Sequence, residues 1–476
     1  MKPVFKKISL LFVLVSMVQM LSAQIGYKHN VVPSAFPDSL DLAYYGKKYF
    51  GRSVATVVGV NLGVWSFNRF VMKEDFAYIN KHTIRDNFKH GFVWDNDNLD
   101  TNMFFHPYHG NLYFNAARSN GYNYWQSGLF ALGGSAMWEL FMESEYPSTN
   151  DIVATPIGGM ALGETFYRTS DLILDDRAVG SERVGREIAA FIVSPMRGFT
   201  RIINGDAWKH RSSSGRQFGI PDVCIAISVG ARALEFKDEI FDRGLGIASE
   251  IALEYGDRFN TEHEKPYDFF TMNVGLNLQK SQPMLGQVNL VGRLWNRELI
   301  EKSDMVLNGG IYQHFDFYDS NVISDVSPVV PYKIAIPASV YGNGILMGAV
   351  LSDHYRLADR NYNIASGFGT KSHLTALYKD SKFSASLSHE FYRLFTWKGY
   401  DMDIDWASVD PKTLDAQGDE SQSWVHVSEL RLDYRLMKRM YLTGSFMHFN
   451  RKTNYRYYLD VKSSTTSTRL MLTFVL

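Results

Sequence analysis

Residues 106–168 read HPYHGNLYFNAARSNGYNYWQSGLFALGGSAMWELFMESEYPSTNDIVATPIGGMALGETFYR, and this stretch decides how the chain is organised. It combines histidines, carboxylates, an arginine and many small residues in a helical pattern. Beyond about residue 221 the chain instead alternates between apolar and polar residues. We therefore expect an α+β protein, in which an N-terminal helical domain precedes an antiparallel β-barrel that spans a membrane.

The first 23 residues have the composition of a secretory signal peptide. Lysines within the first seven residues precede an apolar run over residues 8–20, and small residues end at Ala23. The apolar run is shorter than the about 20 residues that a membrane-spanning helix needs. A buried N-terminal helix is the alternative. We expect a signal peptide over residues 1–23 and an extended leader over residues 24–40.

Composition narrows the class of protein. The formal net charge of −1 gives no reason to expect a nucleic acid as partner. After the signal peptide, no stretch carries the run of about 20 apolar residues that a spanning helix needs. A secreted chain of this kind, with 14% aromatic residues, is typical of an outer-membrane barrel. Cys224 is the single cysteine, which excludes disulfides within the chain and cysteine-rich metal sites.

The helical domain is expected over residues 41–193. Residues 53–67 are apolar on most faces, which predicts a buried core helix too short to span a bilayer. A polar loop follows over residues 86–105. The next helix is expected over about 111–142, where Gly128, Gly133 and Gly134 allow close approach of a neighbouring helix.

Two further helices are expected before the barrel. Ser148 has the type and spacing of a helix cap, with Asp151 at the third helical position. The helix that begins there should bend at Pro156 and end near residue 174. A short helix is expected over about 181–192, and a glycine-, serine- and arginine-bearing linker over residues 194–220.

Residues 221–476 alternate with a period of two, as half-buried strands do. Three segments show this most clearly: 245–255, 268–279 and 429–436. A soluble sandwich also alternates, but its strands are usually shorter than the about 10 residues that a tilted spanning strand needs. We expect roughly twelve strands, since bacterial barrels favour even numbers. At the C-terminus one face carries Thr468, Leu470, Leu472, Phe474 and Leu476.

The charged residues of these strands are expected to line the lumen, because an arginine facing lipid would cost about 2–4 kcal/mol at mid-bilayer. They are Glu250, Glu254, Arg293, Glu429, Arg431 and Asp433. Tight turns are expected near Asp380 and Met437 on the periplasmic side. Long connections are expected outside, over residues 318–331, 398–421 and 452–463.

The stretch 100–176 resembles an uncharacterised domain-of-unknown-function family of Gram-negative envelope proteins. The resemblance is carried by HPYHGNLYFNAARSNGY, GSAMWELFMESE, STNDIVATPIGGMALGE and RTSDLILDD. It covers about a sixth of the chain, implies an outer-membrane location and implies no activity. An acidic residue after a Gly-Ser helix, followed by S-x-x-D and G-x-x-x-G, is also similar to VanZ-like proteins.

The candidate catalytic residues are His106, Arg118, Glu139 and Glu164. His106 is expected in a proline-containing loop together with His109, and the other three on helices. Antiparallel packing would bring all four into one polar cluster, able to hold a metal or to act as a general acid and base. The structural alternative is that Glu164 pairs with Arg168 one helical turn away. The residues identify no particular cofactor or metal.

The preferred function is an outer-membrane barrel with an envelope or lipid-related role. One alternative is an enzyme that modifies an envelope lipid through the polar cluster. Another is a pore that the helical domain plugs, so that domain is expected on the periplasmic side or in the lumen. The expected partners are outer-membrane lipids, and the sequence identifies no protein partner.

Overall fold

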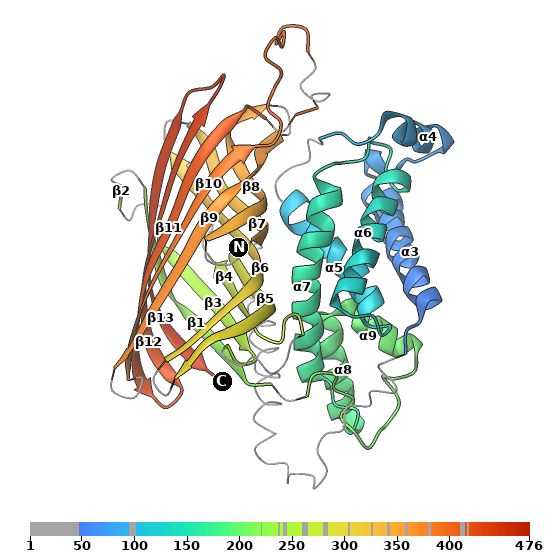
Figure 1. Ribbon diagram of the computed structural model, residues 1–476, viewed down its shortest axis with the longest axis vertical. Helices are drawn as coiled ribbons and strands as arrows, with labels where there is room; N and C mark the ends of the chain where they lie inside the picture. The colour runs from blue at the N-terminus through green and yellow to red at the C-terminus, as the bar shows by residue number, and fades with distance from the viewer. Residues whose placement is uncertain are drawn as a thin grey trace. The chain divides into compact units, whose positions relative to one another are not determined.

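The computed structural model describes residues 47–94, 101–219, 221–236, 239–240, 245–258, 265–278, 284–302, 305–324, 327–339, 343–357, 360–378, 382–409, 415–416 and 418–476. The expected signal peptide, the leader and the turn at Asp380 lie outside these residues. The chain divides into two compact units, one of helices that ends at Pro221 and one of strands that begins at Asp222 (Figure 1). Each is described by itself.

The described helices are α3 Phe50–Ser66, η1 Phe67–Met72, η2 Asp75–Ala77, α4 Lys81–His90, η3 Thr101–Phe105, α5 His106–Arg118, α6 Tyr124–Phe141, α7 Asp151–Ile173, α8 Gly180–Val193 and α9 Pro195–Ile203. Helix α7 starts where the cap was expected, since the Asp151 N–H donates to Ser148 Oγ at 3.1 Å. Helix α8 confirms the short helix expected at 181–192.

Four expectations for the helical unit were wrong, and three of them concern α5, α6 and α9. The helix expected over 111–142 is two helices, because the chain turns at Gly121, whose φ of +90° favours glycine. His106 and His109 lie in the first turn of α5 rather than in a loop, since Pro107 is well tolerated at that position. The expected linker is part of the helical unit, because α9 occupies its first half.

Helix α3 is also not the buried core helix that its composition predicts. Only Ser53, Val57 and Asn61 are buried, so its inward face is largely polar. Together with η1 it gives a helical stretch, Phe50–Met72, that is long and apolar enough to cross a membrane by length and composition alone. It is the one such helix among the described residues.

The centre of the helical unit is the contact between α5 and α7, where two glycines let the backbones touch. A Cβ on Gly110 would lie 1.9 Å from the Thr155 carbonyl oxygen, and one on Gly159 would lie 2.4 Å from the Gly110 carbonyl carbon. Small residues at such contacts are typical of helices that associate without a large apolar interface. Gly134 is similarly close to the Tyr113 ring, whereas Gly133 faces open space.

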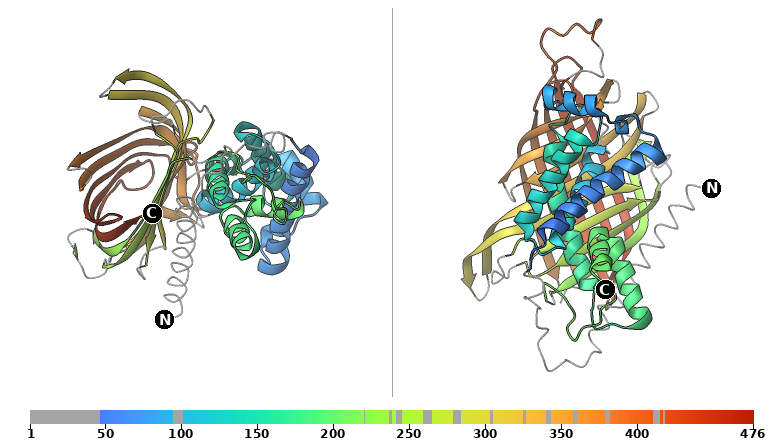
Figure 2. Two further views of the ribbon diagram at one scale, coloured as in Figure 1. Left: turned by 90° about the horizontal axis from the view of Figure 1, so that it is seen from below. Right: turned by 90° about the vertical axis from the view of Figure 1, so that its right-hand side faces the viewer.

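The second unit is one antiparallel sheet that curls on itself (Figure 2). Its described strands are β1 Val223–Phe236, β2 Glu239–Ile240, β3 Gly246–Tyr255, β4 Phe270–Asn277, β5 Leu285–Lys302, β6 Met305–Ser324, β7 Ser327–Ser339, β8 Asn343–Leu357, β9 Arg360–Tyr378, β10 Phe383–Thr396, β11 Ser421–Met437, β12 Met440–Tyr455 and β13 Val461–Val475. Strand β2 pairs only with the end of β1. The other twelve follow one another in order, and β1 pairs with β13 from Ala226↔Val475 to Phe236↔Thr465.

Alternation along the strands separates an apolar outer face from a polar inner face. On β11 the outer face carries Leu430, Leu432, Tyr434 and Leu436, all exposed. Glu250 on β3 pairs with Gly275 on β4, so these two residues share one face of the sheet. Met272 and Leu276 on β4 lie on the other face. An apolar exterior around a polar interior is the pattern of a transmembrane barrel. The fold therefore has the expected class, helices followed by an antiparallel barrel.

The connections agree with expectation at two places and differ at another. Strands β11 and β12 meet in a tight turn between Met437 and Met440, and β10 is joined to β11 by the long segment 397–420. The segment 318–331 is not a loop, because β6 continues to Ser324 and β7 begins at Ser327. The polar residues of 318–331 lengthen two strands instead.

Candidate functional site

An ion-pair triad joins α5 to α7 inside the helical unit. Glu164 accepts from Arg118 Nε at 2.8 Å and from Arg168 Nε at 2.9 Å. The Glu164 side chain is fully buried. Burial alone would raise the pKa of Glu164, but the two guanidinium groups lower it below its ordinary value. Glu164 therefore stays ionised at neutral pH, and the expected pairing with Arg168 is confirmed.

Aromatic rings cover the same arginines. The Arg168 guanidinium lies 3.9 Å from the centroid of Phe218, and Arg118 lies 4.9 Å from the centroid of Tyr167. Such stacking over a ring face stabilises a cation that is withdrawn from water. Arg118 also donates to the Tyr122 carbonyl oxygen at 3.0 Å. These contacts hold both guanidinium groups in fixed positions.

The four candidate residues do not form one cluster. Arg118 and Glu164 meet, but His106 pairs with Asp151 at 3.5 Å, and Glu139 accepts from the Ser148 N–H at 2.8 Å. At about 1.5 Å per residue, Asp151 and Glu164 lie roughly 20 Å apart along α7. The expectation of convergence was wrong because Asp151, the partner of His106, lies at the start of α7, whereas Glu164 lies more than three turns further along the same helix.

His109 forms a small polar contact inside the unit. Its Nδ1 lies 3.4 Å from the Tyr113 hydroxyl, which in turn donates to the Asn61 side chain. Burial, and secondarily the charge of His106, lowers the pKa of His109 to about 3. The imidazole is therefore neutral at physiological pH. Among the described residues no three His, Cys, Asp or Glu side chains lie close enough together to hold a metal ion.

A larger set of buried arginines follows on α8 and α9, and sequence reasoning missed it. Arg183 and Arg201 both reach Asp176, at 3.0 and 2.6 Å. Arg201 also pairs with Glu187 at 2.9 Å, and Arg197 pairs with Asp171. The signal was present in residues 194–220, where the arginines were ascribed to a linker. On α8 the signal was that arginines occupy the helix face opposite to a stripe of apolar residues.

Two neighbouring hollows lie in the helical unit beside these arginines. The polar pocket is small, with a volume of about 30 Å³, and its lining includes Lys47, Ser119, Arg197 and Arg201. The apolar groove has a volume of about 590 Å³ between α3 and α8–α9, and its lining includes Gly59, Val60, Phe191, Met196, Phe199 and Ile203. Asn120, Thr200 and Asn204 line both. The two hollows, one polar and one apolar, therefore share a wall.

The shared wall carries polar atoms that lack a hydrogen-bond partner. They are Asn120 Oδ1 and Thr200 Oγ1, both buried, and Ser119 Oγ in the polar pocket is a third. Asn120 and Thr200 are 2% and 6% exposed. Buried polar atoms are nearly always paired, and each exception calls for an explanation. Asn120 and Thr200 lie in the wall that the polar pocket shares with the apolar groove.

The barrel interior is bridged by its own side chains. Arg431 on β11 reaches Glu250 on β3 at 2.6 Å, and Arg469 on β13 reaches the same carboxylate at 3.6 Å. Asp433 accepts from Thr443 at 2.6 Å, and Glu429 accepts from Ser445 at 2.6 Å. These residues confirm the expected charged lining.

The other two predicted lumen residues differ from each other. Arg293 is buried and pairs with Asp268 at 2.8 Å. Glu254 lies near the end of β3, pairs with Arg258 at 3.0 Å and remains 44% exposed. Glu254 is therefore not part of the interior network. Alternation in the sequence predicts which face of a strand a residue occupies, but it does not predict how far along the barrel axis that residue lies.

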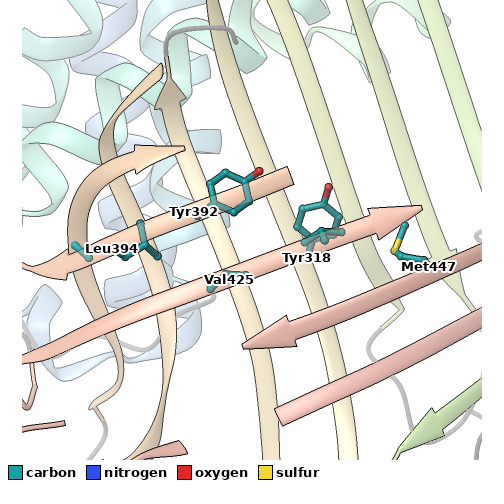
Figure 3. Packing of buried hydrophobic residues seen from close by; sticks show 7 residues of the cluster. Tyr318, Tyr392, Leu394, Val425 and Met447 are labelled. Carbon is teal, nitrogen blue, oxygen red and sulfur yellow. The ribbon is translucent and has the colours of Figure 1, made fainter. Parts of the chain in front are cut away.

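An apolar cluster fills another part of the interior (Figure 3). Its buried members are Tyr318, Ala365, Tyr392, Leu394, Val425, Val427 and Met447. The Tyr318 ring on β6 also meets Phe449 on β12, with centroids 5.4 Å apart. Strands β6 and β12 are not neighbours in the sheet, so this contact crosses the interior.

Comparisons with known proteins give a family match over part of the chain. Residues 91–196 match the model of a family described as "Domain of unknown function (DUF3943)". No curated protein matches the chain. Solved structures with similarity include Ail of Yersinia pestis, with 9% identity, 54% of this chain and 100% of that chain covered, and a TM-score of 0.16. CymD, a monoaromatic hydrocarbon channel, has 8% identity, 55% and 90% coverage and a TM-score of 0.19. The outer membrane protein AlkL has 10% identity, 54% and 92% coverage and a TM-score of 0.16.

Proposed function

We propose that this protein is an outer-membrane barrel whose helical domain contacts the lipid bilayer. In that domain apolar side chains face outward and charged side chains face inward. One observation carries the proposal, the orientation of α8. Its buried face holds Arg183 and Arg186 beside the small residues Ala189 and Ala190, whereas its large apolar residues Val184, Ile188 and Ile192 are exposed. In a water-soluble domain the apolar stripe of a helix faces the core.

Helix α9 has the same inverted arrangement. Arg197, Thr200 and Arg201 are buried, whereas Phe199 and Ile203 are exposed. Leaving apolar surface in water costs about 25 cal/mol per Å², and burying charges requires that each be paired. The ion pairs of this unit supply partners for its buried charges. Contact with lipid would remove its exposed apolar side chains from water.

The barrel supports an outer-membrane location. Its exterior is apolar along β10 to β13, and an even ring of strands brings both ends of the barrel to the same side of the membrane. The long connection 397–420 lies at the end opposite to those termini, where outer-membrane barrels carry their longer loops. We propose that the helical domain lies on the periplasmic side, because it precedes the first strand of the barrel.

The two alternative functions have less support. An enzyme that uses Glu164 as a general acid or base needs a carboxyl that exchanges protons near neutral pH, and the paired Glu164 does not. A pore needs an open lumen. Side chains of the described strands cross the barrel interior where Arg431 contacts Glu250 and where Tyr318 contacts Phe449. A structural or lipid-binding role requires neither feature.

The proposal is tested by photo-crosslinking in vesicles. The full-length protein is reconstituted with a phosphatidylcholine that carries a photoactivatable group in its acyl chain, and crosslinked peptides are mapped by mass spectrometry. We expect crosslinks in α8 and α9 as well as in the outward faces of β10 to β13. Crosslinks confined to the barrel strands would contradict the proposal.

A further inference from the structure

We propose that the helical domain holds one anionic phospholipid, with its phosphate where the polar pocket meets the apolar groove and an acyl chain in the groove. This inference rests on the proposed function and deepens it, since it names the ligand and the site. It differs from general lipid contact, because it requires a saturable site with a defined headgroup. The experiment below separates the two.

The groove has the chemistry of an acyl-chain site. Its walls are the apolar side chains of α3, α8 and α9, including Val60, Phe191, Met196 and Phe199. A volume of about 590 Å³ is large enough for a lipid chain, since small-molecule sites span roughly 300–1,000 Å³. Gly59 leaves room on the α3 side, because a Cβ there would meet no atom within 4 Å. An apolar chain is the occupant that such walls favour.

The junction has the chemistry of a headgroup site. Thr200 Oγ1 and Ser119 Oγ are hydroxyls that can donate to phosphate oxygens, and Asn120 Oδ1 can accept from a headgroup hydroxyl. A phosphate diester that carries a glycerol headgroup supplies both kinds of partner. A choline headgroup has no hydroxyl or N–H group to donate to Asn120.

The charges at the junction favour an anion. Lys47 and Arg52 lie at the start of α3, and among the residues that the structure describes neither pairs with a carboxylate. Arg52 donates to Asn204 Oδ1 at 2.9 Å, so its guanidinium sits beside the shared wall. Arg197 and Arg201 in the polar pocket are already paired with Asp171, Asp176 and Glu187. Lys47 and Arg52 therefore supply the positive charge that favours an anion at the junction.

The test is native mass spectrometry of the full-length protein in a neutral detergent, titrated with phosphatidylglycerol or phosphatidylcholine. We expect one phosphatidylglycerol to bind saturably and phosphatidylcholine to bind about tenfold more weakly or worse, since the choline cation would face Lys47 and Arg52 and would leave Asn120 Oδ1 without a donor. Soluble glycerol phosphate should compete poorly, because the acyl chain contributes the remaining affinity. Equal binding of both lipids, or binding that never saturates, would overturn the proposal.

Variants locate the site. Gly59→Leu fills the groove and should lower phosphatidylglycerol affinity by about tenfold or more. Gly63→Leu is the matched control, because Gly63 lies one turn further on α3, also faces open space and does not line the groove. Equal affinities of the two variants would overturn the groove as the acyl-chain site.

A second pair tests the headgroup. Thr200→Val removes an unpartnered hydroxyl without leaving a cavity, so it should preserve the fold and lower phosphatidylglycerol affinity. The double change of Lys47 and Arg52 to Glu should abolish the preference for the anionic lipid, whereas Arg85→Glu on exposed α4 should leave it unchanged. An unaltered preference in the double variant would overturn the headgroup assignment. Acyl-chain crosslinks to α8 without saturable binding would refute the site and retain the proposed function.

Discussion

At the scale of single residues, Glu164 is a carboxylate that stabilises the helical unit. It is fully buried between Arg118 and Arg168. Glu164→Gln would leave two guanidinium groups facing each other, and removing one partner of a buried pair costs about 3–5 kcal/mol. We expect a loss of that order in the free energy of unfolding, measured by urea denaturation in detergent.

Glu182→Gln provides the control for Glu164. Glu182 pairs with Arg186, but its side chain is 50% exposed, so the loss should stay below about 1 kcal/mol. Equal losses for the two variants would contradict the assignment of Glu164 as a structural ion pair.

His109 gives the unit a pH dependence. Its pKa falls from 6.5 to about 3 on folding, so the unfolded chain binds a proton over a range in which the folded protein does not. The free energy of unfolding should therefore decrease as pH falls below about 6.5. Glu164 contributes a further loss only near and below its ordinary value of 4.5, because its pKa is lowered.

His109→Gln isolates the histidine contribution. The variant should show a flatter dependence of unfolding free energy on pH between 6.5 and 5 than the parent protein, because glutamine does not titrate. Chemical denaturation across that range is the measurement. Identical slopes in the two proteins would show that His109 takes up a proton in the folded state.

At the scale of elements, the contact of α5 with α7 predicts opposite signs for two glycine substitutions. Gly159→Ala places a Cβ 2.4 Å from the Gly110 backbone, so it should destabilise by about 1–3 kcal/mol or more. Gly133→Ala on α6 meets no atom within 4 Å and should stabilise by about 0.5–1 kcal/mol through helix propensity. Thermal unfolding distinguishes them, and equal shifts would contradict the described packing.

The strands predict a similar contrast on β11. Leu430 lies on the outer face near the middle of the strand, so Leu430→Arg should cost about 2–4 kcal/mol of stability in vesicles. Asp403→Arg in the connection 397–420 should cost little, because Asp403 is exposed outside the strands. Comparable losses in urea titrations of the two variants would place Leu430 away from lipid.

The elements were predictable from sequence to different degrees. Strands such as β4 and β11 were readable because alternation is a local signal with a period of two. The rotation of a helix about its axis was not, since α3 and α8 expose apolar residues that a soluble fold would bury. Partners far apart in sequence, such as Arg201 with Asp176, follow from that rotation and were missed.

At the scale of the whole molecule, the four residues that we expected in one cluster lie in separate contacts. Arg118 and Glu164 were expected in one cluster with His106 and Glu139, and of these four only Arg118 and Glu164 meet, on small-residue helices that approach closely. The junction at Asn120 and Thr200 was not expected, because it depends on how α9 is placed beside α3. Pockets built from three separate elements leave no periodic signal in a sequence.

The central claim, that α8 turns its apolar face to lipid, is tested most directly by spin-label accessibility in vesicles. With Cys224 replaced by serine, a nitroxide is placed at Ile188 or at Glu182 on the same helix. We predict that the label at Ile188 collides mainly with lipid-soluble oxygen and the label at Glu182 mainly with a water-soluble nickel chelate. Equal access of the nickel chelate to both positions would place α8 in water and contradict the claim.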